Sequence, residues 1–345
     1  MRNKLFPASV AAMATAMVMG PVAAIADEGD TLAQVRERDM LNCGVNTGLV
    51  GFAAPDANGN WSGFDVAICK AVAAAVLGDT SKVKYVPTTG QSRFTALESG
   101  EVDLLARNST WTFQRDVSMK FSFTAVNYYD GQGFMVRKDL GVTSAMDLDD
   151  KTICVQSDTS TQMNLADWFR ANNLTYQVVH VDSNSEGEQQ YMAGACDAYT
   201  TDASGLAATR AAFADPDNHV ILPEIISKEP LAPAVRHGDD NWADIVRWTL
   251  FALISAEEYG VTSANLEELS KSSNNPDVQR MLGISDDYGA MMGLDREWAK
   301  RAIAASGNYG EIFAANIGEQ TPIGLPRGLN ALWTQGGLMY AMPFR

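Results

Sequence analysis

The chain has 345 residues, of which 46% are hydrophobic and 20% charged, and its 42 acidic and 26 basic side chains give a net charge of −16. This length is sufficient for two packed domains, and the hydrophobic fraction is sufficient for their cores. A chain that is disordered throughout is therefore excluded. The negative charge repels phosphate backbones and anionic lipids, so we expect no nucleic-acid partner.

The first 26 residues have the pattern of a secretory signal peptide. Arg2 and Lys4 form a basic start, residues 5–20 are apolar and uncharged, and small residues precede Asp27. The apolar run is too short for a membrane-spanning helix, and no cysteine follows it to carry a lipid anchor. We therefore expect cleavage after residue 26 and a free protein in the periplasm.

The next part of the chain alternates strand and helix patterns. Strands are predicted over residues 40–45, 83–86 and 102–106, and helices over residues 63–77 and 92–97. Such alternation predicts an α/β lobe whose ligand site lies at the carboxyl ends of the strands.

The segment 107–115 (RNSTWTFQR) directly follows the third of these strands. Alternation places Thr110 and Thr112 on one face, and Arg115 begins the next helical turn. A guanidinium can hold a carboxylate through two parallel hydrogen bonds, so this segment could bind the α-carboxylate of an amino acid. The alternative is a surface pair of Arg115 with Asp116 after an ordinary turn.

A second α/β set is predicted from residue 152 onward. Its strands are expected over residues 152–155, 177–181 and 198–201, and its helices over residues 161–172, 186–193 and 205–213. We therefore expect two lobes, one made of residues 27–135 and 231–345 and the other of residues 136–230. The extended segments 131–137 and 232–236 would form the hinge, unless both are ordinary core strands.

Two places in the second lobe are candidates for binding. Residues 156–161 (QSDTST) lie between a strand and a helix, where free backbone N–H groups and the positive helix end suit a carboxylate. Capping by Thr159 or Ser160 would explain the same residues. Asp202 ends a strand and could receive an ammonium group, or cap the helix that follows.

The four cysteines are expected to form disulfides in an exported protein. We expect Cys43 to pair with Cys69 and Cys154 with Cys196, because each pair lies within one predicted lobe; buried free cysteines are the alternative. No metal-binding spacing and no nucleotide-binding motif is present, so no metal or cofactor is expected. From residue 241 onward the pattern is helical, notably over residues 242–259 and 307–318.

Several long motifs together resemble one family. They include GNWSGFDVAICKAVAAAV, SRFTALESGEVDLL, RNSTWTFQRD and VILPEIISKEPLAPAVRHGDD, and the likeness covers essentially all of residues 27–345. The chain resembles the periplasmic solute-binding proteins of ABC-type amino-acid transporters, in particular the general L-amino-acid and glutamate/glutamine/aspartate/asparagine-binding branch. This resemblance implies a type II periplasmic-binding-protein fold, with two α/β lobes joined by two strand crossovers and the ligand in the cleft between them.

The resemblance also implies roles for individual residues. Arg115 and Thr110 would hold the α-carboxylate with help from the backbone of Ser160 and Thr161, and Asp202 with the Asn108 carbonyl would hold the α-ammonium group. Arg93 matches the position that reaches the side-chain carboxylate in glutamate/aspartate-binding members. At the position of Asn46 some relatives have an acidic residue or an arginine, and the neutral amide here could tolerate acidic and amide ligands alike. Phe52 and Trp111 would line the pocket or belong to the core.

We therefore predict a transport receptor rather than an enzyme. It would capture a polar L-amino acid, close about its hinge and deliver the ligand, as a monomer by default, to a membrane permease whose ATPase is a separate chain. Two alternatives remain open at this point. Dehydratases of cyclic amino-acid precursors share the fold but need a general acid in the cleft, and a sensory receptor could use the same closed form.

Overall fold

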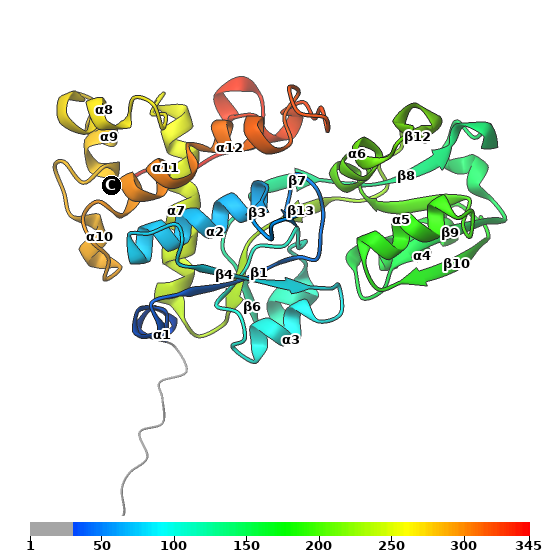
Figure 1. Ribbon diagram of the computed structural model, residues 1–345, viewed down its shortest axis with the longest axis horizontal. Coiled ribbons are helices and arrows are strands. Elements are labelled where there is room, and N and C mark those ends of the chain that lie inside the picture. The colour runs from blue at the N-terminus through cyan, green and yellow to red at the C-terminus, as the bar shows by residue number, and fades with distance from the viewer. Residues whose placement is uncertain (1–29) are drawn as a thin grey trace, which may run out of the picture.

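The computed structural model describes residues 30–345 and shows two α/β lobes side by side along the long axis of the molecule (Figure 1). The predicted signal peptide over residues 1–26 lies outside the described residues. Each lobe is built around a five-stranded sheet, so the predicted two-lobed α/β fold is confirmed. Among the helices of residues 30–345, none is long and apolar enough to cross a membrane.

The sheet of the first lobe has the strand order β4-β1-β5-β14-β6. Its strands are β1 (Leu41–Asn46), β4 (Val83–Thr88), β5 (Leu104–Leu105), β6 (Phe121–Phe123) and β14 (Ala234–Arg236). The first three run parallel to one another, whereas β14 pairs antiparallel with β5 and β6. The other elements of this part are α1 (Thr31–Arg38), β2 (Ala54–Pro55), β3 (Trp61–Ser62), α2 (Phe64–Leu77), α3 (Arg93–Glu98) and η1 (Gln114–Ser118).

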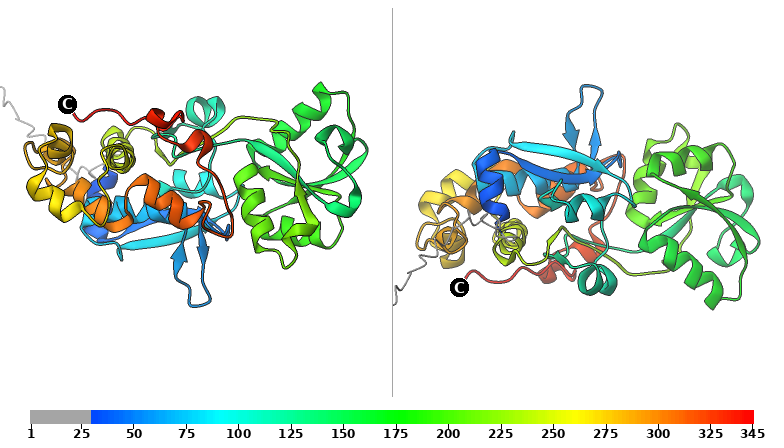
Figure 2. Two further views of the ribbon diagram at one scale, coloured as in Figure 1. Left: turned by 90° about the horizontal axis from the view of Figure 1, so that it is seen from above. Right: turned by 90° about the horizontal axis from the view of Figure 1, so that it is seen from below.

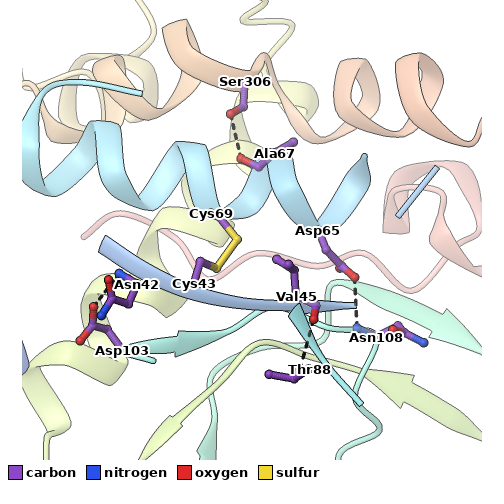
Figure 3. The surroundings of a disulfide bond; sticks show 10 residues. All are labelled: Asn42, Cys43, Val45, Asp65, Ala67, Cys69, Thr88, Asp103, Asn108 and Ser306. Atoms are coloured by element: carbon purple, nitrogen blue, oxygen red, sulfur yellow. Dashed lines mark hydrogen bonds between the residues drawn. A yellow bond between two sulfur atoms is a disulfide. The ribbon is translucent and has the colours of Figure 1, made fainter. Parts of the chain in front are cut away.

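Helix α2 packs against β1 and forms part of the core of the first lobe. Its alanines and valines favour a buried helix, and it ends at Gly78, whose φ of 71° lies in the left-handed region that glycine adopts readily. The disulfide between Cys43 and Cys69 ties β1 to this helix, as Figure 3 shows. The predicted helix over residues 63–77 is thus confirmed.

The sheet of the second lobe has the order β10-β9-β11-β8-β12. Its strands are β8 (Gln132–Arg137), β9 (Lys151–Gln156), β10 (Tyr176–Val181), β11 (Ala198–Asp202) and β12 (His219–Ile221). The helices are α4 (Ser160–Ala171), α5 (Asn184–Met192) and α6 (Ala203–Ala212), with short 3₁₀ turns η2 (Lys138–Leu140), η3 (Ala145–Leu148) and η4 (Pro216–Asn218). The second disulfide, Cys154–Cys196, lies in this lobe, so both pairings predicted from the sequence are present.

A short antiparallel ribbon lies where the chain passes between the lobes. It consists of β7 (Tyr128–Asp130) and β13 (Glu229–Leu231). Of the two alternatives for the segments 131–137 and 232–236, the strand pairing favours core strands, because β8 pairs with β11 and β12 in the second sheet and β14 pairs within the first. Short runs of apolar residues next to glycine or proline are common to core and hinge strands, which is why pattern alone did not separate them. The expected division at residues 135–136 falls inside β8.

The C-terminal part of the chain covers the first lobe, as both views in Figure 2 show. Its elements are α7 (Asp240–Glu258), α8 (Leu266–Ser272), α9 (Pro276–Met281), α10 (Tyr288–Met291), α11 (Trp298–Ser306), α12 (Tyr309–Asn316), η5 (Gly328–Asn330) and η6 (Trp333–Gln335). Helix α11 packs along α2 and α7. The side chain of Asn330 accepts a hydrogen bond from the Tyr129 N–H (2.7 Å) and donates one to its carbonyl (3.1 Å), so this segment also braces the ribbon between the lobes.

Candidate functional site

A small polar cavity lies between the two lobes. It forms where β5, β9 and β11 end, because the residues at the ends of these strands and in the loops that follow face one another across the cleft. Its volume is about 20 Å³, room for about one water molecule. The lining residues are Arg93, Arg107, Asn108, Thr110, Gln156, Thr159, Ser160, Thr161, Asn184, Thr201 and Asp202.

Six of the eight ligand-binding residues expected from the resemblance line this cavity. They are Arg93, Asn108, Thr110, Ser160, Thr161 and Asp202. Arg115 instead lines an adjoining groove of about 660 Å³, which also runs between the lobes and shares Thr159 with the cavity. Asn46 is fully buried and does not line the cavity. Its amide donates hydrogen bonds to Asn108 (3.1 Å) in its own lobe and to Asn184 (3.3 Å) in the other lobe.

Arg115 is held in the interior rather than on the surface. Its side chain is 5% exposed, and its Nη1 donates a hydrogen bond of 2.7 Å to the carbonyl of Thr110. Its guanidinium carbon lies 5.0 Å from the ring centroid of Phe94, a cation–π distance. Burial lowers the pKa of Arg115 to about 10, so the group still carries its charge at neutral pH.

The second lobe presents the beginning of α4 to the same place. Thr159 is the helix cap, since its Oγ1 accepts a hydrogen bond from the Gln162 N–H (3.1 Å). This leaves Ser160 to reach across the cleft, where its Oγ lies 3.0 Å from the Oγ1 of Thr110. Hydroxyls from both lobes therefore meet at one point beside the positive end of a helix.

Asp202 occupies the cap position of α6 without acting as a cap. Its carboxylate accepts no hydrogen bond from the helix, and Asn108 of the other lobe donates to it through Nδ2 at 3.5 Å. Burial raises the pKa of Asp202 well above the usual range, and the nearby carboxylates Asp130 and Glu229 raise it further. A cation placed beside Asp202 would relieve this unfavourable burial of negative charge.

Three charged residues at the site were missed by the sequence analysis. Arg107 lines the cavity, and Glu229, on β13, accepts hydrogen bonds from Thr110, from Ser160 (2.8 Å) and from Asn164 (2.6 Å). Asp65, at the start of α2, points towards Asn108 and accepts a hydrogen bond of 3.1 Å from its N–H (Figure 3). Burial raises the pKa of Asp65 to about 7.

Signals for these three residues were present but weak. Arg107 directly follows an apolar strand, Glu229 precedes a proline, and Asp65 interrupts an apolar helix. Each pattern is also common outside binding sites.

The two aromatic residues considered for the pocket lie elsewhere. Phe52 is buried in the core of the first lobe against Phe64 and Tyr128, and Trp111 stacks on Phe123 outside the cavity. No group of histidine, cysteine, aspartate and glutamate side chains in residues 30–345 is placed to hold a metal ion.

Comparison with known proteins decides the family. The family model of the "Bacterial extracellular solute-binding proteins, family 3" matches residues 41–265. The chain belongs to this family. It is similar over 100% of both chains to the "Glutamate/glutamine/aspartate/asparagine-binding protein BztA" of Rhodobacter capsulatus (63% identity) and to the "General L-amino acid-binding periplasmic protein AapJ" of Rhizobium johnstonii (56% identity).

A solved structure of another solute-binding protein agrees with the fold. It is the "ABC transporter / periplasmic binding protein from Brucella ovis with glutathione bound", which is 54% identical and superposes with a TM-score of 0.89 over 92% of this chain and 100% of that chain. The family match ends at residue 265, so α8 to α12 lie beyond the part that defines the family. The superposition with the Brucella protein covers 92% of this chain, so it nevertheless includes most of that C-terminal part.

Proposed function

We propose that this solute-binding protein captures polar L-amino acids between its lobes and delivers them to the membrane permease of an ABC transporter, whose ATPase is a separate chain. One observation carries the proposal: buried guanidinium and carboxylate groups from opposite lobes converge on one cavity. The names of the Rhodobacter and Rhizobium relatives favour glutamate, glutamine, aspartate and asparagine, or L-amino acids more broadly, as ligands.

The two ends of an amino acid would be held from different sides. Arg115 and Thr110 of the first lobe, with Ser160 and the backbone at Thr161 in the second, would bind the α-carboxylate through charge-assisted hydrogen bonds. Asp202 of the second lobe and the carbonyl of Asn108 in the first would bind the α-ammonium group. The ligand would thus be contacted by both lobes at each end.

Lobe movement follows from the size of the cavity. The cavity alone, at about 20 Å³, is too small for an amino acid, which would also occupy part of the adjoining groove of about 660 Å³ where Arg115 lies, and the lobes must separate to admit it. The direct contacts across the cleft, such as those of Thr110 with Ser160 (3.0 Å) and of Asn46 with Asn184 (3.3 Å), must break during opening. Because only the closed form brings both lobes onto the ligand, ligand binding favours closure.

The cell compartment and mode of action follow from the same features. We infer export to the periplasm by a signal peptide over residues 1–26, consistent with the two disulfides. We also infer that the protein acts as a monomer and binds its ligand without catalysis. A sensory receptor would use the same closed form, and growth of a deletion strain on glutamate separates the two roles.

A glutathione-like peptide is a second candidate ligand. The Brucella relative was solved with glutathione, which carries a free α-amino-acid group at one end. In this chain the groove of about 660 Å³ beside the cavity is lined partly by Phe94, Met119 and Met163, and it could take the remainder of such a peptide. Glutathione therefore belongs in any ligand panel.

Replacing Arg115 tests the proposal. Arg115→Ala removes the cation proposed to hold the α-carboxylate, and we expect it to weaken amino-acid binding at least ~100-fold in calorimetry of ligand-stripped protein. Arg170→Ala is the control, because the Arg170 side chain is 78% exposed and lines neither the cavity nor the groove. Near-wild-type affinity of Arg115→Ala would contradict the assignment. Release of an aromatic product from arogenate or prephenate would overturn the binding function.

A further inference from the structure

One carboxylate of the cleft is bound by the chain's own side chains. Glu229 lies on β13, in the ribbon between the lobes, and is only 1% exposed. Its Oε2 accepts hydrogen bonds from the hydroxyls of Thr110 and Ser160, the latter at 2.8 Å. Its Oε1 accepts two more, from Asn164 (2.6 Å) and from Ser227 (2.6 Å). A carboxylate has about four acceptor positions, so that of Glu229 is fully occupied.

The two donors to Oε2 are the hydroxyls proposed above to hold the α-carboxylate of an amino acid. Thr110 contributes one of them from the first lobe and Ser160 the other from the second, and their oxygens are 3.0 Å apart. A hydroxyl has a single proton to donate. While both protons are donated to Glu229, neither hydroxyl can donate to the carboxylate of a ligand.

The charge of Glu229 also acts on the proposed cation of the site. Burial lowers the pKa of Arg115 to about 10, and the negative charges of Glu229 and Asp202 act in the opposite direction. A ligand carboxylate beside Arg115 would therefore share the guanidinium's charge with a carboxylate that is already present, and like charges repel each other.

We propose that Glu229 is an internal competitor of the ligand. Its carboxylate holds the hydroxyl protons of Thr110 and Ser160, and both hydroxyls must turn away from it before they can bind the α-carboxylate of an amino acid. Glu229 thus lowers the affinity for every L-amino acid alike and retakes both hydroxyls when the ligand leaves. The inference rests on the proposed function and deepens it, because it names a residue that sets how tightly the same site binds.

Two other roles for Glu229 lead to the opposite expectation. As a partner of the α-ammonium group it would strengthen binding, but its acceptor positions are filled, whereas within residues 30–345 the Asp202 carboxylate accepts only one hydrogen bond, of 3.5 Å. As a brace, it would hold the two hydroxyls in place beside the ribbon, where the Trp111 N–H donates to the Pro230 carbonyl (2.8 Å). In either role, removing the charge of Glu229 would weaken the binding of amino acids.

Calorimetry of ligand-stripped protein distinguishes these roles. Glu229→Gln keeps the size of the side chain and replaces a charged acceptor by a neutral one, whose hydrogen bonds are weaker. We expect this variant to bind L-glutamate and L-glutamine each about 10-fold more tightly than the wild type, so that the ratio of the two Kd values stays the same.

Glu224→Gln is the matched control. Glu224 also accepts a hydrogen bond from a serine hydroxyl, that of Ser144 at 2.5 Å, but it lines neither the cavity nor the groove. Both Kd values should therefore be those of the wild type.

The outcomes separate the inference from the proposed function. If wild-type protein and Glu229→Gln bind no amino acid, the proposed function fails and the inference fails with it. If the wild type binds and Glu229→Gln binds equally or more weakly, Glu229 is no competitor, while the proposed function stands. Tighter binding of glutamate alone would also refute the inference, because Glu229 would then act on the side chain of the ligand.

Should Glu229→Gln fail to fold, a crystal structure of the wild-type protein with bound glutamate decides the question. Hydroxyl oxygens of Thr110 and Ser160 that lie beyond about 3.5 Å from the Glu229 carboxylate support the inference. Hydrogen bonds from both hydroxyls to Glu229 in that complex contradict it.

Discussion

Adding a single methyl group at Gly90 should hinder closure without disturbing either lobe. Gly90 is buried where the first lobe touches the turn before α4 in the second. A Cβ atom there would lie 2.7 Å from the carbonyl oxygen of Ser157 and 3.2 Å from Cγ2 of Thr159. Both atoms belong to the opposite lobe. The φ angle of Gly90 is outside the left-handed region, so Gly90→Ala carries no backbone penalty of its own.

The size of the effect follows from the contacts that closure makes. The distance of 2.7 Å between the added Cβ and the Ser157 carbonyl oxygen is shorter than ordinary van der Waals contact, which begins at 3.4 Å. The two lobes of the variant therefore cannot approach each other as closely as those of the wild type. Hydrogen bonds between ligand and second lobe would then lengthen. Losing two or three of them costs roughly 2–3 kcal/mol, or about 30- to 150-fold in Kd.

Calorimetry with glutamate on ligand-stripped Gly90→Ala measures this loss. Glu98→Ala is the control, because Glu98 lies at the end of the adjacent α3, is exposed and lines neither the cavity nor the groove. Thermal unfolding of both variants should match that of the wild type, since the methyl group meets only the other lobe. Unchanged affinity in Gly90→Ala would refute the view that the lobes come this close when the ligand is bound.

Three further predictions concern stability. The second disulfide closes a loop between cysteines 42 residues apart in the sequence. We expect the double variant Cys154→Ala, Cys196→Ala to lose roughly 4 kcal/mol of unfolding free energy in guanidinium, and a loss below about 1 kcal/mol would contradict this. Asn330→Ala leaves the main-chain N–H and carbonyl of Tyr129 without their partner, and should lower the free energy of unfolding in urea by about 2 kcal/mol. An unchanged unfolding midpoint would show that water replaces the amide. Because burial raises the pKa of Asp65 from 3.8 to about 7, the folded state keeps a proton that the unfolded chain releases, and stability falls as pH rises between those values. Asp65→Asn should remove that loss. The free energies of unfolding measured at about pH 5 and at about pH 8 should therefore differ less in the variant than in the wild type.

The local elements could be predicted well from the sequence. The helix over residues 63–77 combines a run of alanine and valine with glycine at each end, and the structure has α2 over Phe64–Leu77. Likewise the strand predicted over residues 40–45 is β1. In both segments nearly all residues are buried, so the local pattern and the tertiary environment favour the same conformation.

The hinge and the charged lining of the cleft could not be predicted in the same way. Glu229 accepts hydrogen bonds from Thr110 and Ser160, which lie 119 and 69 residues away in the sequence. Nothing within a local window shows that such residues meet. Arg107 illustrates the same limit, because an arginine after a strand is ordinary on a surface and significant only when the fold buries it beside the cavity.

The most direct test of the account is calorimetry of ligand-stripped protein against L-amino acids. The panel comprises glutamate, glutamine, aspartate, asparagine, alanine, leucine and histidine, with glutathione added. We predict one site per chain with micromolar or tighter Kd, about −8 kcal/mol or more favourable, for the acidic and amide members. Absence of binding across the whole panel would contradict the claim that the cavity between the lobes captures an amino acid.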